Sequence, residues 1–166
     1  MEPVTVAQFV SRIPTAFAEG DPEVSAKRLE AENVRLLHQL YSAVTRGDFD
    51  AACDYMAEDV VLEILGPPAM PLTGRWQGRA QVREALPRNF GLLENQQPEL
   101  QTVVAQGDTV IVLARERGCY RATGREYDIH LVQQFQFLAG RIVLIREFCD
   151  SLSLVEAAQA PPRHAS

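Results

Sequence analysis

The chain has 166 residues, of which 46% are hydrophobic and 23% charged, as is typical of one globular domain with its own core. Its formal net charge of -6 argues against nucleic-acid binding, which needs a basic patch to neutralise phosphates. No apolar stretch reaches the roughly 18 residues that a membrane span requires, so we expect no membrane partner either.

The sequence contains 3 cysteines, and they share no spacing typical of a metal site. Their neighbours are apolar, so we expect buried, reduced thiols. The N-terminal residues lack the basic segment and apolar core of a secretion signal, which predicts a cytoplasmic protein. The cysteines are Cys53, Cys119 and Cys149.

The first 21 residues are expected to form an amphipathic arm. Residues 4–18 carry apolar side chains at helical spacing, interrupted at Pro14. The arm could act as a lid or a dimer clasp, although plain helix packing is the default interpretation. The apolar positions are Val6, Phe9, Val10, Ile13 and Phe17.

A cone-shaped domain is expected over residues 22–158, followed by a flexible tail at 159–166. Apolar spacing predicts helices over about 22–46 and 48–56 and another after Gly78, with a strand at 59–65. From residue 99 onward the apolar residues recur with a period of two instead, which predicts an antiparallel meander of four strands. These strands are 99–107, 108–121, 125–138 and 141–150, joined by polar turns.

Several of these strands are apolar on both faces, as in residues 141–150, where Ile142, Leu144 and Phe148 alternate with Val143 and Ile145. A sheet that is buried on both faces needs two covers, and the helices supply only one. We therefore expect the outer face to pack on a second subunit in a homodimer.

Three segments together resemble the SnoaL-like, ketosteroid-isomerase-related branch of the nuclear-transport-factor-2-like superfamily. The resemblance spans about residues 30–152 and implies an α+β fold in which a curved antiparallel sheet wraps on three helices around a deep apolar pocket. It also implies that two copies of the chain pair through the convex face of the sheet. The segments are "YSAVTRGDFDAACDYMAEDVVLEI", "PLTGRWQGRAQVREAL" and "TGREYDIHLVQQFQFLAGRIVLIREFCD".

The catalytic residues of known relatives are only partly present. The base, tyrosine and second acid of ketosteroid isomerase align with Ile64, Leu40 and Gln133, so that mechanism is not expected. The Arg, Asp and final-strand Asp of limonene-epoxide hydrolase align with Ala114, Glu116 and Glu147. Two acids remain there, but the central Arg is missing, and the Tyr and Asn that hold its water align with Leu62 and Ile64.

In the fold that the resemblance implies, Glu147 and Glu116 point into the pocket. They are therefore the candidate catalytic pair. A carboxylate on an apolar face has to be hydrated, paired or protonated, and a second acid nearby would raise its pKa further. For Glu147, a structural ion pair with Arg115, Arg117 or Arg146 is an equally good interpretation. For Glu116 alone, a solvated strand rim is the simpler one.

Gln133 is expected to contact a ligand, because an amide in an apolar row must find partners. Trp76 is either a roof over the entrance or an ordinary core aromatic, and His38 and Tyr41 are expected to be packed or surface residues. The predicted substrate-binding set is Gln133, Leu40, Leu62, Ile64, Trp76, Ala114, Leu131, Phe135, Ile145 and Cys149.

Neither a metal nor a cofactor is expected. Asp128 and His130 lie two apart on a strand, but without a third ligand this is a weak metal signal. The sequence therefore predicts cofactor-free acid-base chemistry, of cyclase, isomerase or epoxide hydrolase type, on a small apolar molecule carrying a carbonyl or epoxide. The alternative is a noncatalytic module that binds a small ligand or mediates dimerisation.

Overall fold

The computed structural model describes residues 22–159, so the expected N-terminal arm and nearly all of the expected tail lie outside the described residues. The longest helix is α2 (Pro22–Thr45), whose buried stripe contains Leu37, Leu40 and Ala43. The chain leaves the helix through Gly47, which has φ 72, a conformation that glycine adopts without strain. The sequence analysis correctly predicted this helix and its end.

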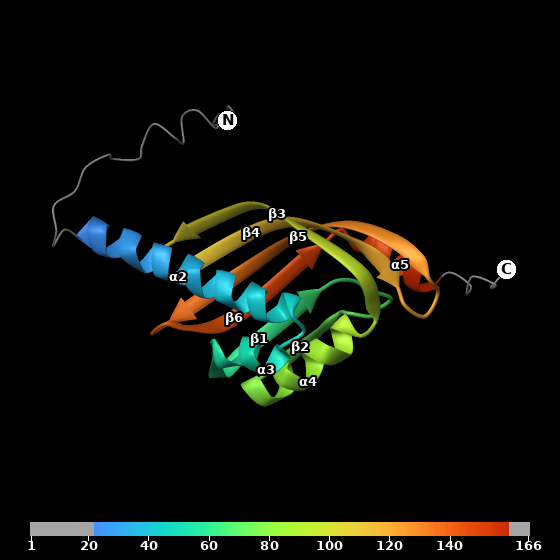
Figure 1. The fold of residues 1–166 in the computed structure, drawn as a ribbon, viewed down its shortest axis with the longest axis horizontal. Coiled ribbons are helices and arrows are strands. Elements are labelled where there is room, and N and C mark those ends of the chain that lie inside the picture. Colours follow the sequence, from blue (N-terminus) through green and yellow to red (C-terminus); the bar gives the residue numbers. More distant parts are fainter. Residues whose placement is uncertain (1–21, 160–166) are drawn as a thin grey trace, which may run out of the picture.

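Two shorter helices follow, α3 (Phe49–Asp54) and α4 (Arg79–Phe90). The side chain of Asp48 caps α3 by accepting a hydrogen bond of 3.1 Å from the backbone N–H of Ala51. Helix α4 follows Gly78, as expected, and buries Val82, Ala85 and Asn89 on one side. The last helix, α5 (Ser151–Gln159), lies at the end of the molecule away from the start of α2 (Figure 1).

The sheet has six strands in the order β2-β1-β6-β5-β4-β3. All neighbours are antiparallel except β1 and β6, which run parallel. The expected meander from the third to the sixth strand is therefore present. The strands are β1 (Met56–Leu65), β2 (Gly74–Gln77), β3 (Leu93–Gln106), β4 (Thr109–Tyr120), β5 (Arg125–Leu138) and β6 (Arg141–Cys149).

Two strand bounds and one element differ from the sequence prediction. Strand β1 begins at Met56 rather than 59, and β3 begins at Leu93 rather than 99. The first part of β3 contains Pro98 and no clear alternation, which an edge strand tolerates because one side of its backbone needs no partner. Strand β2 lies between the strand expected at 59–65 and the helix expected after Gly78, where no strand was predicted, and its four residues pair with β1.

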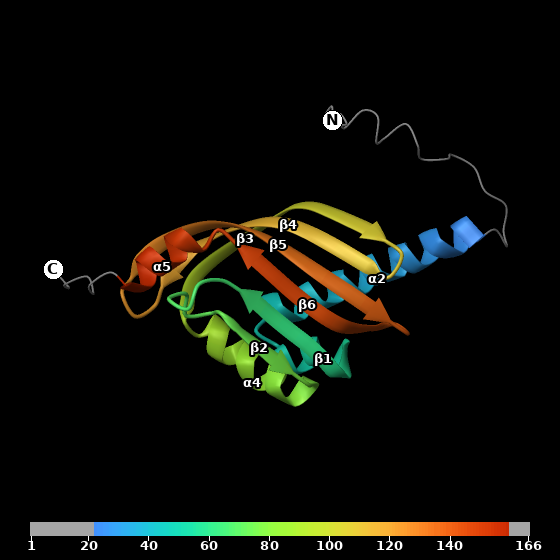
Figure 2. The same cartoon turned by 180° about the vertical axis from the view of Figure 1, so that it is seen from behind.

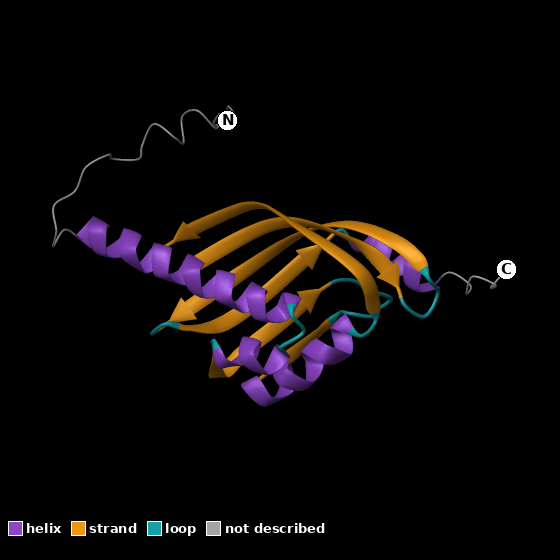
Figure 3. Cartoon of the chain, in the orientation of Figure 1, coloured by secondary structure: helices purple, strands orange, loops and turns teal. Residues whose placement is uncertain are grey.

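The helices α2, α3 and α4 lie on one face of the curved sheet (Figures 1 and 3). From behind, the strands lie in front of α2 (Figure 2). The core fills the space between helices and sheet, and Phe135, Met56 and Val60 are almost completely buried there. This is the α+β cone expected from the resemblance, with a concave face toward the helices and a convex outer face.

One strand face was assigned incorrectly. Ile142 was expected on the outer face, but it is completely buried and only Leu144 and Phe148 remain on that face. The reason is a register shift: Phe137 pairs with Ile142 while Gln136 pairs with Leu144, so Val143 is an extra residue. A bulge of this kind reverses the alternation on one side of itself.

No helix among the described residues has both the length and the apolar character needed to cross a membrane.

Candidate functional site

A cavity of about 630 Å³ lies between the helices and the concave face of the sheet. Its wall is mostly apolar, with a few polar side chains from α2, α4 and the strands β3 to β6. Such a lining is typical of a site for a small organic molecule. The lining residues are Tyr41, Val44, Thr45, Ile64, Leu72, Asn89, Phe90, Leu93, Gln96, Pro98, Leu100, Ala114, Arg115, Glu116, Ile129, Leu131, Gln133 and Glu147.

Strand register brings two of the expected polar residues side by side. Gln133 of β5 pairs directly with Glu147 of β6, so both project from the same face of the sheet. Glu116 of β4 projects from that face as well, because Glu116 and Gln133 each alternate in step with the buried residues of their strands. All three side chains reach the cavity.

A hydrogen-bonded chain runs from α2 to Glu147. The hydroxyl of Tyr41 donates to Oε1 of Gln133, and Nε2 of Gln133 donates to Oε2 of Glu147 over 2.7 Å. The ring of Phe135 packs edge-on against Tyr41, with 6.0 Å between ring centroids, and so fixes the position of the hydroxyl. Within residues 22–159, Oε1 of Glu147 has no hydrogen-bond partner, which leaves it available to a ligand.

The surroundings of Glu147 raise the pKa of its carboxyl group. Burial is the main cause, because it penalises the charged form, and the negative charge of Glu116 adds to it. The hydrogen bond from Gln133 acts in the opposite direction. Although part of the Glu147 side chain is accessible, that part faces the cavity, and the enclosed wall explains why burial dominates its pKa.

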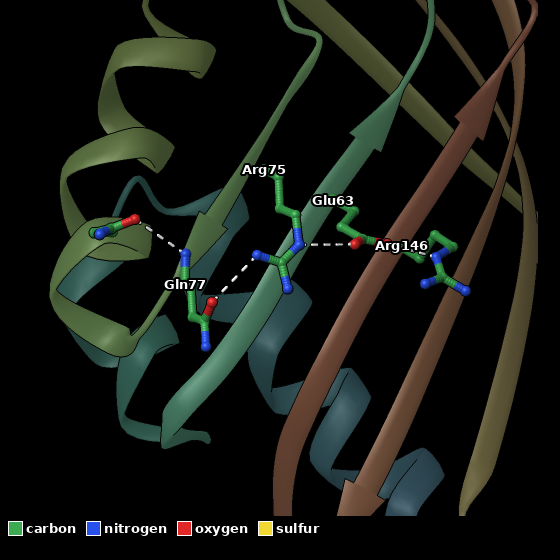
Figure 4. Close-up of polar contacts among 5 residues, drawn as sticks. Glu63, Arg75, Gln77 and Arg146 are labelled. Atoms are coloured by element: carbon green, nitrogen blue, oxygen red, sulfur yellow. Dashed lines mark hydrogen bonds and ion pairs between the residues drawn. The ribbon is translucent and has the colours of Figure 1, made fainter.

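The structure rejects the interpretation of Glu147 as a member of an ion pair. Arg146 binds Glu63 on the outer face, with 2.7 Å between Nε and Oε2, and Arg75 holds the other oxygen of Glu63 (Figure 4). Arg115 binds Asp128, and Arg117 lies 3.9 Å from Glu99. None of these arginines reaches Glu147, whose partner is an amide instead.

Glu116 is not on a solvated rim. Its Oε1 accepts a hydrogen bond of 2.6 Å from the hydroxyl of Tyr127 and one of 3.3 Å from Nε2 of Gln96. Burial raises the pKa of Tyr127, as do the hydrogen bond to Glu116 and its charge, so the phenol stays neutral and donates. Oε2 of Glu116 has no partner among the described side chains and lies at the cavity wall.

The remaining predicted site residues divide into two groups. Ile64, Ala114 and Leu131 line the cavity. The other group is buried in or packed against the core: Leu40, Leu62, Phe135 and Ile145 are buried, the Cys149 thiol lies 3.6 Å from the sulfur of Met70, and Trp76 lines a separate shallow hollow beside α4.

Most of the cavity lining was not predicted as site residues, and Tyr41 and Asn89 are two polar examples. Tyr41 was set aside as packed or exposed, yet it follows Leu37 by four residues and so shares the buried side of α2. Asn89 was not considered, although it follows Val82 and Ala85 at helical spacing. In both cases the signal was a polar residue at an apolar position of a helix.

The acidic side chains that reach the cavity are those of Glu116 and Glu147. The described residues contain no group of three His, Cys, Asp or Glu that could hold a metal ion, and Asp128 is occupied by Arg115. Asp128 is an exposed residue of β5 that lies between the buried residues Tyr127 and Ile129. What remains in the cavity is a carboxyl group of raised pKa, oriented by an amide, with a second carboxylate nearby.

Comparison with known proteins agrees with the fold. The family model of the SnoaL-like domain matches residues 37–145. An NTF2-like protein from Burkholderia xenovorans LB400 is 27% identical, with a TM-score of 0.68 over 77% of this chain and 96% of that one. A second NTF2-like protein, from Burkholderia thailandensis E264, is 24% identical, with a TM-score of 0.70 over 77% and 98%.

A third similar structure is that of a protein from Jannaschia sp. CCS1 proposed to be a SnoaL-like polyketide cyclase. It is 21% identical, with a TM-score of 0.68 over 88% of this chain and all of that chain. At this identity the likeness shows a shared fold and not a shared activity. No curated protein matches the sequence significantly.

Proposed function

The chain belongs to the SnoaL-like family, and from the chemistry of its cavity we propose that it is a cofactor-free acid-base enzyme. Its substrate would be a small, largely apolar molecule bearing a carbonyl or epoxide group. Glu147 would transfer the proton, Glu116 would be the second acidic group, and Gln133 with Tyr41 would hold Glu147 in place. The reaction would be a cyclisation, an isomerisation or an epoxide opening.

The single observation that carries this proposal is the setting of Glu147. A carboxyl group with a raised pKa, one oxygen held by an amide and the other facing an apolar cavity, keeps its proton to higher pH than an exposed glutamate does, which suits it to proton transfer. The cyclase proposal for the Jannaschia protein is consistent with this chemistry.

Gln133 was expected to contact the ligand, but its main proposed role is to orient Glu147. Its oxygen accepts from Tyr41 and one of its N–H groups is used on Glu147, so its main effect would be to orient that carboxyl. Contact with a ligand oxygen would fall to its second N–H group. The burial that raises the pKa of the Tyr41 hydroxyl, helped by the charge of Glu147, keeps it a donor in this chain.

The test is proton exchange on a simple ketone. We expect the protein in D₂O to exchange the methyl protons of 2-acetylnaphthalene, with Glu147 taking a carbon-bound proton and returning a deuteron, as followed by NMR. The substitution Glu147→Gln should lower the rate at least about 100-fold, the usual contribution of a positioned acid or base. Hydration of styrene oxide is the corresponding test for epoxide opening.

Glu63→Gln is the matched control, because Glu63 lies on the neighbouring strand but faces outward (Figure 4). It should leave the rate unchanged. If 2-acetylnaphthalene binds but neither probe reacts above the rate in buffer, the noncatalytic binding module is the better account. If Glu147→Gln reacts as fast as the unmodified protein, the assigned role of Glu147 is wrong.

We also propose that two copies of the chain pair through the outer face of the sheet. A row of exposed apolar side chains crosses four strands there, and an exposed row of this kind is typical of an interaction surface. The paired positions in neighbouring strands are Leu113, Val132, Phe148 and Leu65. The resemblance to families that pair through this face supports a second copy as the occupant.

A further inference from the structure

Two acceptor oxygens in the cavity wall are left open by the contacts of their own side chains. They are Oε2 of Glu116 on β4 and Oε1 of Gln96 on β3, and both residues line the cavity. Within the described part of the chain, neither oxygen has a hydrogen-bond partner. The fully shielded unpaired side-chain atoms there belong instead to Asn33, Arg79 and Asn89, so both open oxygens keep surface that a bound molecule can touch.

A bulge in β3 turns Gln96 toward the cavity. Asn95 and Gln96 together lie opposite the single residue Gly118, because the register with β4 shifts there. Asn95 has φ 54, a left-handed conformation that asparagine adopts more readily than most residues. The next residue, Gln97, is exposed, and alternation along the strand places Gln96 on the opposite face. Bulges often lie beside active sites, where they re-aim a side chain in this way.

Hydrogen bonds fix which oxygen of each side chain stays open. Oε1 of Glu116 accepts over 2.6 Å from the hydroxyl of Tyr127 and over 3.3 Å from Nε2 of Gln96. The ring of Tyr127 crosses Gly118 so closely that a Cβ atom there would lie 2.7 Å from the hydroxyl oxygen. The carboxylate is therefore held through one oxygen, and its Oε2 and the amide oxygen of Gln96 remain for a ligand.

Among the described residues that line the cavity, no cation is free to neutralise Glu116. The guanidinium of Arg115 is bound to Asp128, with 2.8 Å between Nε and Oδ1. The rest of the wall is mostly apolar. A ligand that fills this part of the cavity displaces water from the open oxygens, and it loses affinity unless it donates hydrogen bonds in turn.

From these contacts we infer that Glu116 and Gln96 form a subsite for a hydrogen-bond donor of the ligand. This narrows the substrate class to apolar carbonyl or epoxide compounds that also carry a hydroxyl or a protonated amino group. The inference rests on the proposed function, because it assumes that the cavity holds the substrate. Glu147 transfers the proton, and Glu116 holds the substrate by its donor and so determines specificity.

Binding of probes that share one apolar frame tests this inference. We expect 2-naphthalenemethanol to bind at least about tenfold more tightly than its methyl ether in calorimetric titrations, because a hydrogen bond to a charged acceptor is stronger than a neutral one. Each probe has to reach only this subsite, so the distance to Glu147 does not enter the comparison. A third probe, 2-naphthylmethylamine, identifies the donor.

If the natural donor is an amino group, the amine should bind more tightly than the alcohol, with an affinity that falls as salt is added. If it is a hydroxyl group, the alcohol should bind at least as tightly as the amine. Either order supports the subsite, provided that the alcohol exceeds the ether.

Variants assign the preference to these two residues. Glu116→Gln puts an N–H group where the open oxygen was, and this group donates to an ether, so the advantage of the alcohol should disappear. Gln96→Leu should reduce that advantage about threefold, the effect of one neutral acceptor. Gln97→Leu is the matched control, because Gln97 is the exposed neighbour on the same strand, and it should change nothing. Glu147→Gln should also keep the preference.

The outcomes separate the inference from the proposal beneath it. If the alcohol has no advantage, if Glu116→Gln retains it, or if Glu147→Gln loses it, the inference is overturned, and the proposed function stands as long as 2-acetylnaphthalene exchanges its protons. If the preferences hold but no exchange occurs, the proposed function fails and Glu116 remains the donor subsite of a noncatalytic binding module. If no naphthalene binds, both fail.

Discussion

Glu63 and Glu147 lie on neighbouring parallel strands of the sheet, and their surroundings are opposite. Glu63 faces outward between Arg75 and Arg146, and the hydrogen bonds from these two arginines hold its pKa below the ordinary value (Figure 4). Glu147 faces the cavity, where burial raises its pKa and an amide is its partner. One sheet thus carries an ionised carboxylate on one face and a proton-transfer candidate on the other.

The two glutamates look alike in the sequence. Each interrupts an apolar run, "VVLEIL" for Glu63 and "VLIREF" for Glu147. What differs is which face the strand turns toward the helices, because alternate side chains of a strand point in opposite directions. The face of the sheet therefore decides whether a carboxyl group is paired with arginines or lines the cavity.

The largest expected effect concerns the outer face. Phe148 is 47% exposed in the single chain, so Phe148→Arg should hardly disturb the fold, but it would place a charge twice in a symmetric apolar interface. We expect the dimer dissociation constant to rise at least about 100-fold. Light scattering should then report a single chain of 18.5 kDa instead of twice that mass.

Leu29→Arg is the control, because Leu29 is similarly exposed but lies on α2, on the other side of the sheet. It should leave the dimer intact. A protein that is monomeric without any substitution would contradict the assigned use of the outer face and leave the cavity proposal untouched.

The opposite pKa shifts of Glu147 and Glu63 should make the stability of the fold depend on pH in opposite ways. A raised pKa means that the folded state holds a proton which the unfolded state has released, so Glu147 costs stability as pH rises above about 4.3, the ordinary value for glutamate. A lowered pKa means the reverse, so Glu63 stabilises the fold at neutral pH and loses that effect only as pH falls through its lowered pKa.

At pH 8 we therefore expect Glu147→Gln to raise Tm by a few degrees and Glu63→Gln to lower it, as measured by calorimetry. At pH 5 the gain from Glu147→Gln should shrink, because pH 5 is closer to the ordinary pKa of glutamate, below which a raised pKa costs no stability. The loss from Glu63→Gln should persist at pH 5. If both substitutions shift Tm in the same direction at pH 8, the pKa values of Glu63 and Glu147 are not shifted in opposite directions.

Most of the architecture could be predicted from local patterns. Period-two alternation predicted four strands, and Gly107, Gly124 and Gly140 all have positive φ in the turns that join them. What could not be predicted was non-local. The parallel pairing of β1 with β6 leaves no local pattern, and the four residues of β2 are too few to show one.

The family resemblance, extended along each strand by the alternation of side chains, predicted that Glu116, Gln133 and Glu147 point toward the helices. All three line the cavity. The same rule places Arg117 and Arg146 on the opposite face, which argues against an ion pair of either one with Glu147. For Arg115, which lines the cavity, only the structure shows that it binds Asp128 instead. The partnership of Gln133 with Tyr41 could not, because it depends on how α2 crosses β5.

The smallest expected effect concerns the Tyr41 hydroxyl. Tyr41→Phe removes one hydrogen bond to Gln133 and keeps the ring that packs on Phe135. Gln133 still donates to Glu147 but is held less firmly, so we expect the exchange rate to fall only about threefold to tenfold, the effect of one neutral hydrogen bond.

The dependence of that rate on pH is the more specific readout. The Tyr41 hydroxyl does not contact the carboxyl, so the pKa that governs the rate should stay nearly unchanged in Tyr41→Phe. Tyr127→Phe is the matched control on the Glu116 side of the cavity and should leave the orientation of Glu147 intact. A fall of 100-fold in Tyr41→Phe would instead show that the tyrosine itself takes part in proton transfer, which would make Gln133 a relay rather than a support.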